Sequence, residues 1–383
     1  MKRIVLLGST GSIGVNTLKV VERHPEEFQV VGLAAGSQVE RLAQQVRAFR
    51  PKVVALRDES RVGQFRALLN GNFPQILTGS DGVEALASME GVDRVVVAIT
   101  GAAALAPTLA AIQKGRFIGL ANKETLVMAG GLVMEEARAH GAEMVPIDSE
   151  HCAIFQCLKG HSRQEIRRIL LTTSGGPLKD VPKEQFGGLS KEKVMDHPRW
   201  KMGPKITVDS ATMMNKALEL IEARWLFDVS VERIEVVVHP EAIVHSMVEF
   251  IDGSILAQLG VTDMRLPIQY ALTFPERLAS PLPALDLVSL SRLTFEAPQR
   301  AKFPCLDFGY RAAEAQGTMP AALNAANETC VRGFLEDRLP FTRIPSVIER
   351  VLSRHRNVLR PTLDQILESD RWAREQAEAQ IAQ

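Results

Sequence analysis

Three carboxylate residues in otherwise apolar segments are the side chains of this sequence best suited to chemistry. Asp148 and Glu150 lie in residues 146–151, and Glu219 ends the segment of residues 209–219. Because a carboxylate is costly to bury unless its charge is compensated, these acids predict a bound cation. A hard divalent cation fits best, since it prefers oxygen ligands and leaves coordination positions open for substrate oxygens.

Neutral and cationic side chains stand close to the third acid. Ser210, Asn215 and Lys216 precede Glu219 and suit an anionic, oxygen-rich ligand. Asn215 and Glu219 are four residues apart, so they share one face of the helix expected from near residue 211 to residue 227. Two simpler interpretations stay open: Ser210 could cap that helix, and Lys216 could form a surface salt bridge with Glu219.

A glycine-rich turn, Gly8-Ser9-Thr10-Gly11-Ser12-Ile13-Gly14, follows the first apolar run. Such a turn between a strand and a helix allows close backbone approach and presents N–H groups to a pyrophosphate. The second strand ends at Ala34-Ala35-Gly36-Ser37-Gln38 without the acid that NAD-preferring folds place there. Ser37 and Gln38 can donate hydrogen bonds to a phosphate, which favours NADP. Neither is cationic, so the expected preference is moderate.

Two other loops follow predicted strands. Asn122-Lys123-Glu124 comes after the strand of residues 117–120, where ligands bind in open α/β sheets, although a solvated loop with a surface ion pair is equally compatible. Thr172-Thr173-Ser174-Gly175-Gly176-Pro177 could form an anion-binding nest or an ordinary turn.

Residues 174–205 show little periodicity, and loops of that length are often functional lids. Within them, His197-Pro198-Arg199-Trp200-Lys201-Met202-Gly203 contains an isolated Trp. Trp200 could cover a bound ligand when the lid closes, or it could pin the loop to the body of the protein. Three histidines are expected to be structural or to support metal ligands: His151, His239 and His245.

Composition limits the class of protein. With 383 residues, the chain is expected to form two or three domains. Zero formal net charge gives no sign of a nucleic-acid or membrane partner, and 46% hydrophobic residues argue against disorder. The four cysteines lack zinc-site spacing, and no apolar run reaches membrane-spanning length. A cytoplasmic protein is therefore expected.

Short β-branched runs alternate with amphipathic helices up to about residue 147, which predicts a doubly wound, Rossmann-like parallel sheet. The strands are expected at residues 4–7, 30–34, 53–56, 95–99, 117–120 and 144–147, with helices such as 39–49 and 130–140 between them. Beyond residue 150, a helix at 152–158 and strands at 166–172, 234–238, 244–250 and 255–259 predict an α+β region. A proline-rich connector and a helical C-terminal region follow.

In their order along residues 2–334, these motifs resemble the 1-deoxy-D-xylulose 5-phosphate reductoisomerase family. The resemblance also rests on Asp148-Ser149-Glu150-His151 and Leu323-Asn324-Ala325-Ala326-Asn327-Glu328. It implies an NADPH domain at residues 1–149, a catalytic domain at 150–274, a linker at 275–304 and a C-terminal helical domain at 305–383. It also implies a homodimer.

The resemblance assigns a role to each matching residue. It implies NADPH contacts from Thr10, Gly11, Ser12, Ile13, Gly36, Ser37, Gln38, Asn122, Glu124 and Gly203. It implies a Mg²⁺, Mn²⁺ or Co²⁺ ion held by Asp148, Glu150 and Glu219. Substrate contacts are implied for Lys123, Ser149, Glu150, Ser174, His197, Ser210, Asn215, Lys216 and Glu219, and a catalytic role for Lys123, His197 and the three metal ligands.

The implied reaction rearranges 1-deoxy-D-xylulose 5-phosphate to an aldehyde, by retro-aldol and aldol steps, and reduces the aldehyde with NADPH to 2-C-methyl-D-erythritol 4-phosphate. This reaction belongs to isoprenoid precursor synthesis. Ser37 stands where some relatives have a basic residue, and Cys152 stands where Asn or Ser is usual. A simple NADP-dependent dehydrogenase would not need the three carboxylates, and a non-catalytic NADPH-binding regulator would need neither them nor the lid.

Overall fold

The computed structural model describes residues 1–69, 71, 74–200 and 202–383. These residues form two compact units. Unit 1 comprises Met1–Thr125, Val133–Cys152 and Asp263–Leu282, and unit 2 comprises Leu126–Leu132, Ala153–Thr262 and Pro283–Gln383. The division into three domains and a linker, with boundaries at residues 149, 274 and 304, stays a prediction.

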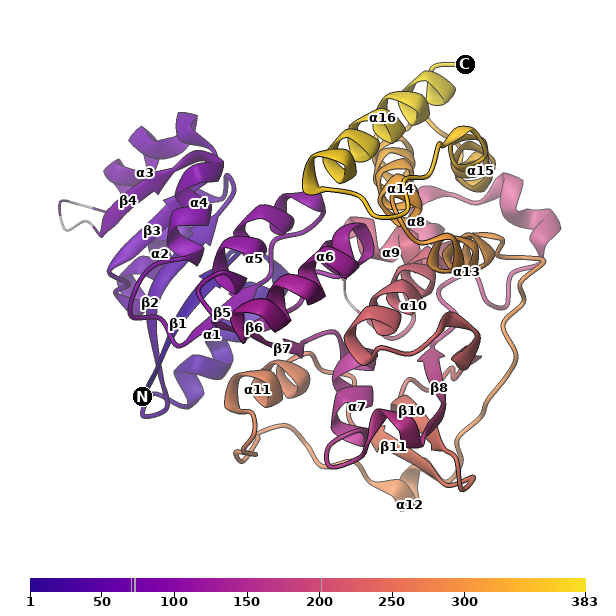
Figure 1. Cartoon of the computed structure of the whole chain (residues 1–383), viewed down its shortest axis with the longest axis horizontal. Coiled ribbons are helices and arrows are strands. Elements are labelled where there is room, and N and C mark those ends of the chain that lie inside the picture. The colour runs from indigo at the N-terminus through magenta and orange to yellow at the C-terminus, as the bar shows by residue number, and fades with distance from the viewer. Residues whose placement is uncertain (70, 72–73, 201) are drawn as a thin grey trace. The chain divides into compact units, whose positions relative to one another are not determined.

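Unit 1 contains a seven-stranded sheet whose neighbouring strands are all parallel, in the order β4-β3-β2-β1-β5-β6-β7 (Figure 1). The strands are β1 (Lys2–Leu7), β2 (Phe28–Ala35), β3 (Val53–Leu56), β4 (Gln75–Thr78), β5 (Arg94–Val97), β6 (Phe117–Leu120) and β7 (Glu143–Pro146). The order reverses between β1 and β5, which is the topological switch point where open α/β sheets bind ligands. The predicted doubly wound fold is confirmed.

The strands of unit 1 are apolar along their length because helices cover the parallel sheet. In β1, the side chains from Ile4 to Leu7 are fully buried. The helices of this unit are α1 (Ser12–Arg23), α2 (Val39–Phe49), α3 (Val62–Leu68), α4 (Gly79–Ala87), α5 (Leu105–Ile112) and α11 (Arg265–Thr273). Helices α6 (Glu124–His140) and α7 (Ser149–Cys157) contribute residues to both units.

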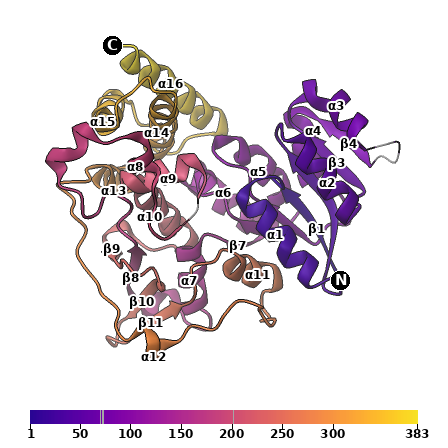
Figure 2. The same ribbon diagram turned by 180° about the vertical axis from the view of Figure 1, so that it is seen from behind.

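Unit 2 contains a four-stranded mixed sheet in the order β11-β10-β8-β9 (Figure 2). Its strands are β8 (Ile166–Thr173), β9 (Ile234–Val238), β10 (Val244–Phe250) and β11 (Ile255–Leu259). Strand β8 pairs with β9 in parallel and with β10 antiparallel. The predicted α+β region is confirmed, and the predicted bounds of β9, β10 and β11 coincide with the observed ones.

The remaining helices of unit 2 include a C-terminal bundle. They are α8 (Lys191–Met195), α9 (Pro204–Ala211), α10 (Met214–Phe227), α12 (Leu287–Leu290), α13 (Cys305–Ala315), α14 (Met319–Leu335), α15 (Ile344–Arg354) and α16 (Leu363–Ile381). Figure 1 shows α13 to α16 grouped together, and α14 is buried along most of its length. The predicted helical C-terminal region is confirmed.

Several local predictions differ from the structure. Helix α7 begins at Ser149, three residues before the predicted position 152. The single helix expected from near residue 211 is two helices, α9 and α10, because Met213 adopts a left-handed conformation (φ 63°) that interrupts the hydrogen-bond ladder. Strand β4 was missed because it is short and only partly buried. Helix α6 begins six residues before the predicted position 130, at Glu124. No helix among the described residues is both long and apolar enough to cross a bilayer.

Candidate active site

The predicted ligand-binding residues of unit 1 follow the carboxyl ends of β1, β2, β6 and β7. These ends share one edge of the sheet because all the strands run in the same direction. The edge carries Thr10 to Ile13 after β1, Gly36 to Gln38 after β2, Asn122 to Glu124 after β6, and Asp148 to Glu150 after β7. One edge of one sheet therefore brings together the unit 1 residues expected to contact nucleotide, metal and substrate.

The turn after β1 has no room for side chains at two glycines. Gly8 has φ +85°, and a Cβ there would lie 2.8 Å from the backbone nitrogen of Ile99. A Cβ at Gly14 would overlap the carbonyl oxygen of Gly8. Gly11 stands at the N-cap of α1 with an extended backbone and no side-chain cap, so the first N–H groups of the helix are free of a capping side chain. This geometry fits a pyrophosphate.

The side chain of Asn122 joins the ends of β5 and β6. Its amide nitrogen donates to the carbonyl oxygens of Ile99 (2.8 Å) and Gly101 (3.1 Å) and to the Glu124 carboxylate (2.9 Å). Its amide oxygen accepts from the Thr125 backbone at 2.7 Å. Asn122, Lys123 and Glu124 are all buried, so the alternative of a solvated loop is wrong.

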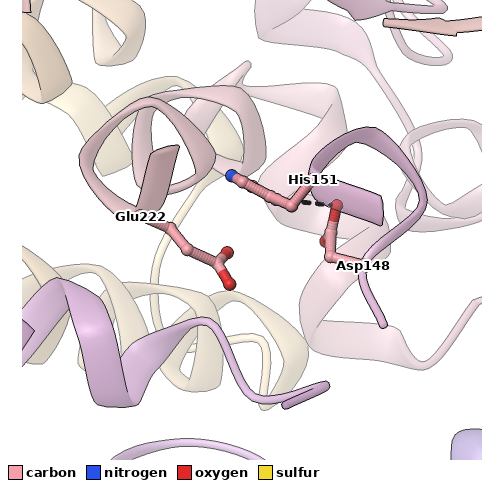
Figure 3. Close-up of side chains that lie close together, drawn as sticks. All are labelled: Asp148, His151 and Glu222. Atoms are coloured by element: carbon pink, nitrogen blue, oxygen red, sulfur yellow. Dashed lines mark hydrogen bonds and ion pairs between the residues drawn. The ribbon is translucent and has the colours of Figure 1, made fainter. Parts of the chain in front are cut away.

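Lys123 and His151 both hold the carboxylate of Asp148. The Lys123 ammonium lies 3.1 Å from Oδ2, and Nδ1 of the buried His151 lies 3.1 Å from Oδ1. Figure 3 shows the contact between His151 and Asp148. This contact fixes the orientation of the Asp148 carboxylate, and a role of His151 in supporting a metal ligand stays a prediction.

Ser149 and Glu150 form the first turn of α7, directly after Asp148. The Ser149 hydroxyl donates to the Glu150 carboxylate at 2.5 Å. An acidic group is favourable at this position because it faces the positive end of the helix dipole. Both side chains are partly exposed, so they are accessible to a ligand.

In unit 2, Ser174 and His197 meet just beyond the end of β8. The hydroxyl of Ser174 lies 3.3 Å from Nε2 of His197. Nδ1 of His197 accepts hydrogen bonds from the backbone nitrogens of Arg199 (3.2 Å) and Trp200 (2.9 Å). The neutral ring must then carry its proton on Nε2, where it faces Ser174 as a donor. Burial lowers the pKa of His197 to about 4, which keeps the ring neutral near pH 7.

This shift predicts a pH dependence of stability that His197 contributes. Below about pH 6.5 the unfolded chain protonates this ring, whereas the folded protein keeps it neutral until about pH 4. The free energy of unfolding should therefore fall as pH decreases through this window, and the contribution is fully present above it. In urea denaturation at pH 7 and 5.5, His197→Gln should show a smaller loss of stability than the unmutated protein. An unchanged loss would show that His197 titrates normally.

The glycine pair after Ser174 packs against Ser210 of α9. Gly175 and Gly176 have φ +87° and +73°, a region that favours glycine. A Cβ at Gly176 would overlap the carbonyl oxygen of Ser210 and lie 3.2 Å from its Oγ. The two predicted substrate contacts, Ser174 and Ser210, are thus held on neighbouring segments. Ser210 lies inside α9, so the alternative that it caps the following helix is wrong.

Helix α10 carries the remaining unit 2 residues of the predicted site. Asn215 donates from its amide nitrogen to Oε1 of Glu219, and the Lys216 ammonium donates to Oε2. Lys216 and Glu219 are buried, so the alternative of a surface salt bridge is wrong. A buried carboxylate with a cationic and an amide partner is a charge-compensated group that can bind a cation or a polar ligand.

Helices α13 and α14 of the C-terminal bundle contact α10 and α9. The amide nitrogen of Asn327 in α14 donates to the fully buried carboxylate of Asp209 at 2.8 Å, next to Ser210. A Cβ at Gly309 in α13 would overlap Ala217 of α10, so these helices approach closely. These contacts between distant segments were not anticipated from the sequence, although Asn327 belongs to the motif after Leu323.

Trp200 is half-buried, with its ring centroid 6.4 Å from that of His245. Gly203, the last residue of its motif, is exposed and caps α9, while Lys201 lies outside the described residues. Burial lowers the pKa of His245 to about 4, so the Trp200 ring faces a neutral imidazole. This contact places the Trp200 ring against β10, and movement of the segment stays a prediction.

Comparison with known proteins gives matches along nearly the whole chain. A sequence model described as 1-deoxy-D-xylulose 5-phosphate reductoisomerase matches residues 4–130. Models of C-terminal domains of the same reductoisomerase match residues 144–227 and 259–376. The relative from Pelotomaculum thermopropionicum is 52% identical over 375 residues, covering 98% of this chain and 97% of the relative. The relative from Chlorobium phaeobacteroides is 50% identical over 377 residues, with 98% and 99% covered.

Solved structures agree with these matches. The reductoisomerase from Zymomonas mobilis in complex with NADPH has a TM-score of 0.93 at 41% identity, covering 99% of each chain. A DOX-P reductoisomerase in complex with NADPH, fosmidomycin and magnesium has a TM-score of 0.95 at 41% identity, covering 100% of this chain and 98% of the other. The order of the motifs, the two sheets and these full-length similarities lead to one conclusion: the chain belongs to the 1-deoxy-D-xylulose 5-phosphate reductoisomerase family.

Proposed function

We propose that this protein converts 1-deoxy-D-xylulose 5-phosphate to 2-C-methyl-D-erythritol 4-phosphate with NADPH and a divalent cation. The observation that carries the proposal is the pairing of charge-compensated carboxylates with a nucleotide-binding turn on one polypeptide. Asp148 is held by Lys123 and His151, and Glu219 is held by Asn215 and Lys216. Relatives of this family are named for the same conversion.

The residues of unit 1 fit NADPH. The absence of a Cβ at Gly8 and Gly14 leaves the turn after β1 tight enough to present the N-terminus of α1 to a pyrophosphate. Gly36, Ser37 and Gln38 are exposed after β2, where the ribose is expected. We therefore propose nucleotide contacts from the predicted residues of unit 1, together with Gly203 of unit 2. The unit 1 residues are Thr10, Gly11, Ser12, Ile13, Gly36, Ser37, Gln38, Asn122 and Glu124.

The donor set fits a hard divalent cation such as Mg²⁺. Asp148, Glu150 and Glu219 each offer a carboxylate oxygen, which is the ligand type that Mg²⁺ prefers. We propose that these three residues bind the cation, with Lys123 and Lys216 placed to interact with anionic substrate groups. When bound, the cation polarises substrate oxygens and the nicotinamide supplies a hydride.

Other side chains position the substrate. Ser174, Ser210, Asn215 and the Nε2–H of His197 can donate to phosphate or hydroxyl oxygens, and Lys216 adds a positive charge. Because His197 is neutral near pH 7, it donates without a competing protonation event. The carboxylates of Asp148 and Glu219 are held in fixed orientations before substrate arrives, which lowers the reorganisation required in the transition state.

One assay separates this function from its alternatives. NADPH oxidation is followed with the ketose phosphate as substrate, with and without Mg²⁺, and the product is identified by mass spectrometry and NMR. The expected result is Mg²⁺-dependent oxidation with formation of the branched tetritol phosphate. Reduction without rearrangement of the carbon skeleton would indicate a simple dehydrogenase. NADPH binding without turnover would indicate a regulator.

Residues 197–203 are expected to close over the bound substrate. Closure with Trp200 over the ligand would exclude water and strengthen local electrostatic interactions. Trp200→Ala should therefore lower kcat/KM for the ketose phosphate by about 10-fold or more, roughly the effect of losing one buried aromatic contact. NADPH affinity should stay nearly unchanged. Hydrogen exchange in this segment should slow when substrate and metal are added. Exchange that is already slow in the free protein would make Trp200 a structural anchor.

We also propose that the protein is a homodimer. Strand β11 lies at the edge of its sheet and exposes Ile255 and Leu256, and the adjacent Ile251 is 68% exposed. An exposed apolar edge of this kind is suited to an interface with another copy. Sedimentation equilibrium would measure the mass of the assembly directly.

Location in the cytoplasm stays a prediction.

A further inference from the structure

The sequence offers no cation where the 2′-phosphate of NADPH is expected. The loop after β2 contains Gly36, Ser37 and Gln38, which are exposed and uncharged. Space is available there, since a Cβ at Gly36 would meet no atom within 4 Å. A 2′-phosphate carries about two negative charges near pH 7, so neutral donors alone give weak discrimination against NADH. The structure shows where a nearby positive charge lies.

Arg41 stands in the first turn of α2, directly after this loop. Side chains of a helix lean toward its N-terminus, so Arg41 reaches back toward the carboxyl edge of the sheet. Its Nη1 donates to the carbonyl oxygen of Thr10 at 2.8 Å. The guanidinium is thereby anchored between the glycine-rich turn after β1 and the loop after β2.

This position is unusual for a cation, because the N-terminal turn of a helix favours negative charge. The carboxylate of the neighbouring Glu40 accepts from the side chain of Gln64 in α3 at 2.7 Å. Among the described residues, Arg41 has no ion-pair partner, and its side chain is exposed. The bond to Thr10 uses one of the five guanidinium N–H groups, so the fork remains able to bind an anion.

We infer that Arg41 is the residue that recognises the 2′-phosphate of the nucleotide and sets the preference for NADPH. This inference rests on the proposed function, which places a nicotinamide nucleotide at this edge of the sheet. The planar guanidinium can bind phosphate oxygens through two N–H groups, while Ser37 and Gln38 add neutral hydrogen bonds. The bond to Thr10 orients the fork before the nucleotide binds, so less side-chain freedom is lost on binding.

The test compares binding of two nucleotides that differ only in the 2′-phosphate. Isothermal titration calorimetry on the full-length protein measures adenosine 2′,5′-bisphosphate and adenosine 5′-phosphate, without substrate or metal. Arg41→Gln should weaken binding of the bisphosphate by about 10- to 100-fold, the range expected for a lost charge-assisted hydrogen bond. Binding of adenosine 5′-phosphate should change by less than about two-fold, well below that range. The affinity of Arg41→Lys for the bisphosphate should lie between those of the unmutated protein and Arg41→Gln, because lysine keeps the positive charge but lacks the guanidinium fork.

Arg47→Gln is the matched control. Arg47 lies on the same helix, is also exposed, and donates from Nη1 to the carbonyl oxygen of Leu68 at 2.9 Å. Loss of the Arg47 side chain should leave the affinity for both nucleotides unchanged. Arg41→Gln should likewise raise the KM for NADPH but not the KM for NADH, and Arg47→Gln should change neither KM. In the unmutated protein, the ratio of the KM for NADH to the KM for NADPH should decrease as salt increases.

Two results would overturn the inference. Equal weakening of both nucleotides by Arg41→Gln would mean that Arg41 only supports the turn at Thr10. Unchanged bisphosphate binding would mean that the 2′-phosphate is recognised elsewhere. Failure of the proposed function is a separate outcome, because it would show as absent turnover of the ketose phosphate even where selective bisphosphate binding is intact.

Discussion

Asp148→Asn should abolish turnover while leaving the fold and NADPH binding close to those of the unmutated protein. The amide is nearly isosteric and can still accept a hydrogen bond from Lys123 or His151, both of which contact the carboxylate at 3.1 Å. It removes one negative charge from the proposed cation site. Changes to groups that only support a ligand already reduce metal affinity or activity by about 10- to 100-fold. Loss of a ligand should therefore reduce kcat on the order of 1,000-fold or more, even at saturating Mg²⁺.

Three measurements make this result specific. Turnover is measured across a Mg²⁺ titration, NADPH binding is followed by nicotinamide fluorescence, and folding is followed by thermal denaturation. Asp364→Asn is the matched control, since it makes the same chemical change at an exposed position in the first turn of α16. The control should behave as the unmutated protein. Near-normal turnover of Asp148→Asn at any Mg²⁺ concentration would rule out Asp148 as an essential ligand.

The second large effect is expected from Gly176→Ala, which adds a single methyl group. At φ +73° any L side chain is strained, and the new Cβ would overlap the carbonyl oxygen of Ser210. The loop must then move away from α9, which displaces Ser174 relative to Ser210. A displacement of about 1 Å at a positioning group can cost on the order of 100-fold in rate. We expect kcat/KM for the ketose phosphate to fall by about that factor, with NADPH affinity unchanged.

Gly187→Ala provides the control for this substitution. A Cβ at Gly187 would meet no atom within 4 Å, and its φ lies outside the left-handed region. This variant should retain full activity. The strain at Gly176 should also lower the free energy of unfolding by about 1–3 kcal/mol, measured by urea denaturation. If Gly176→Ala lowers the free energy of unfolding but has the same kcat/KM as Gly187→Ala, then the glycine pair is needed for folding and does not position the substrate.

The sequence by itself determined the strands of unit 1 other than β4, and the chemistry at their ends. Buried parallel strands are continuous apolar runs, so segments such as β3 and β6 were bounded correctly. Parallel strands also place their carboxyl ends on one edge, which let the position of Asp148 follow from its place after β7. The motif types identified the family because each is a local pattern that does not depend on contacts with distant residues.

Tertiary structure decided the features that depend on contacts between distant segments. The break at Met213 leaves little trace in the hydrophobic periodicity, because both flanking helices are buried. Burial of Lys216 and Glu219 turned a possible surface pair into a charge-compensated group, and burial depends on packing rather than spacing.

Arg41, the residue proposed to contact the 2′-phosphate, was missed for the same reason. A search of the loop after β2 finds only neutral residues, whereas Arg41 becomes relevant through its bond to Thr10, which is 31 positions away in the sequence. Sequence spacing specifies which residues share a strand end or a helix face, because backbone geometry is periodic. Which side chain of one segment reaches another is set by packing, and only the folded chain shows it.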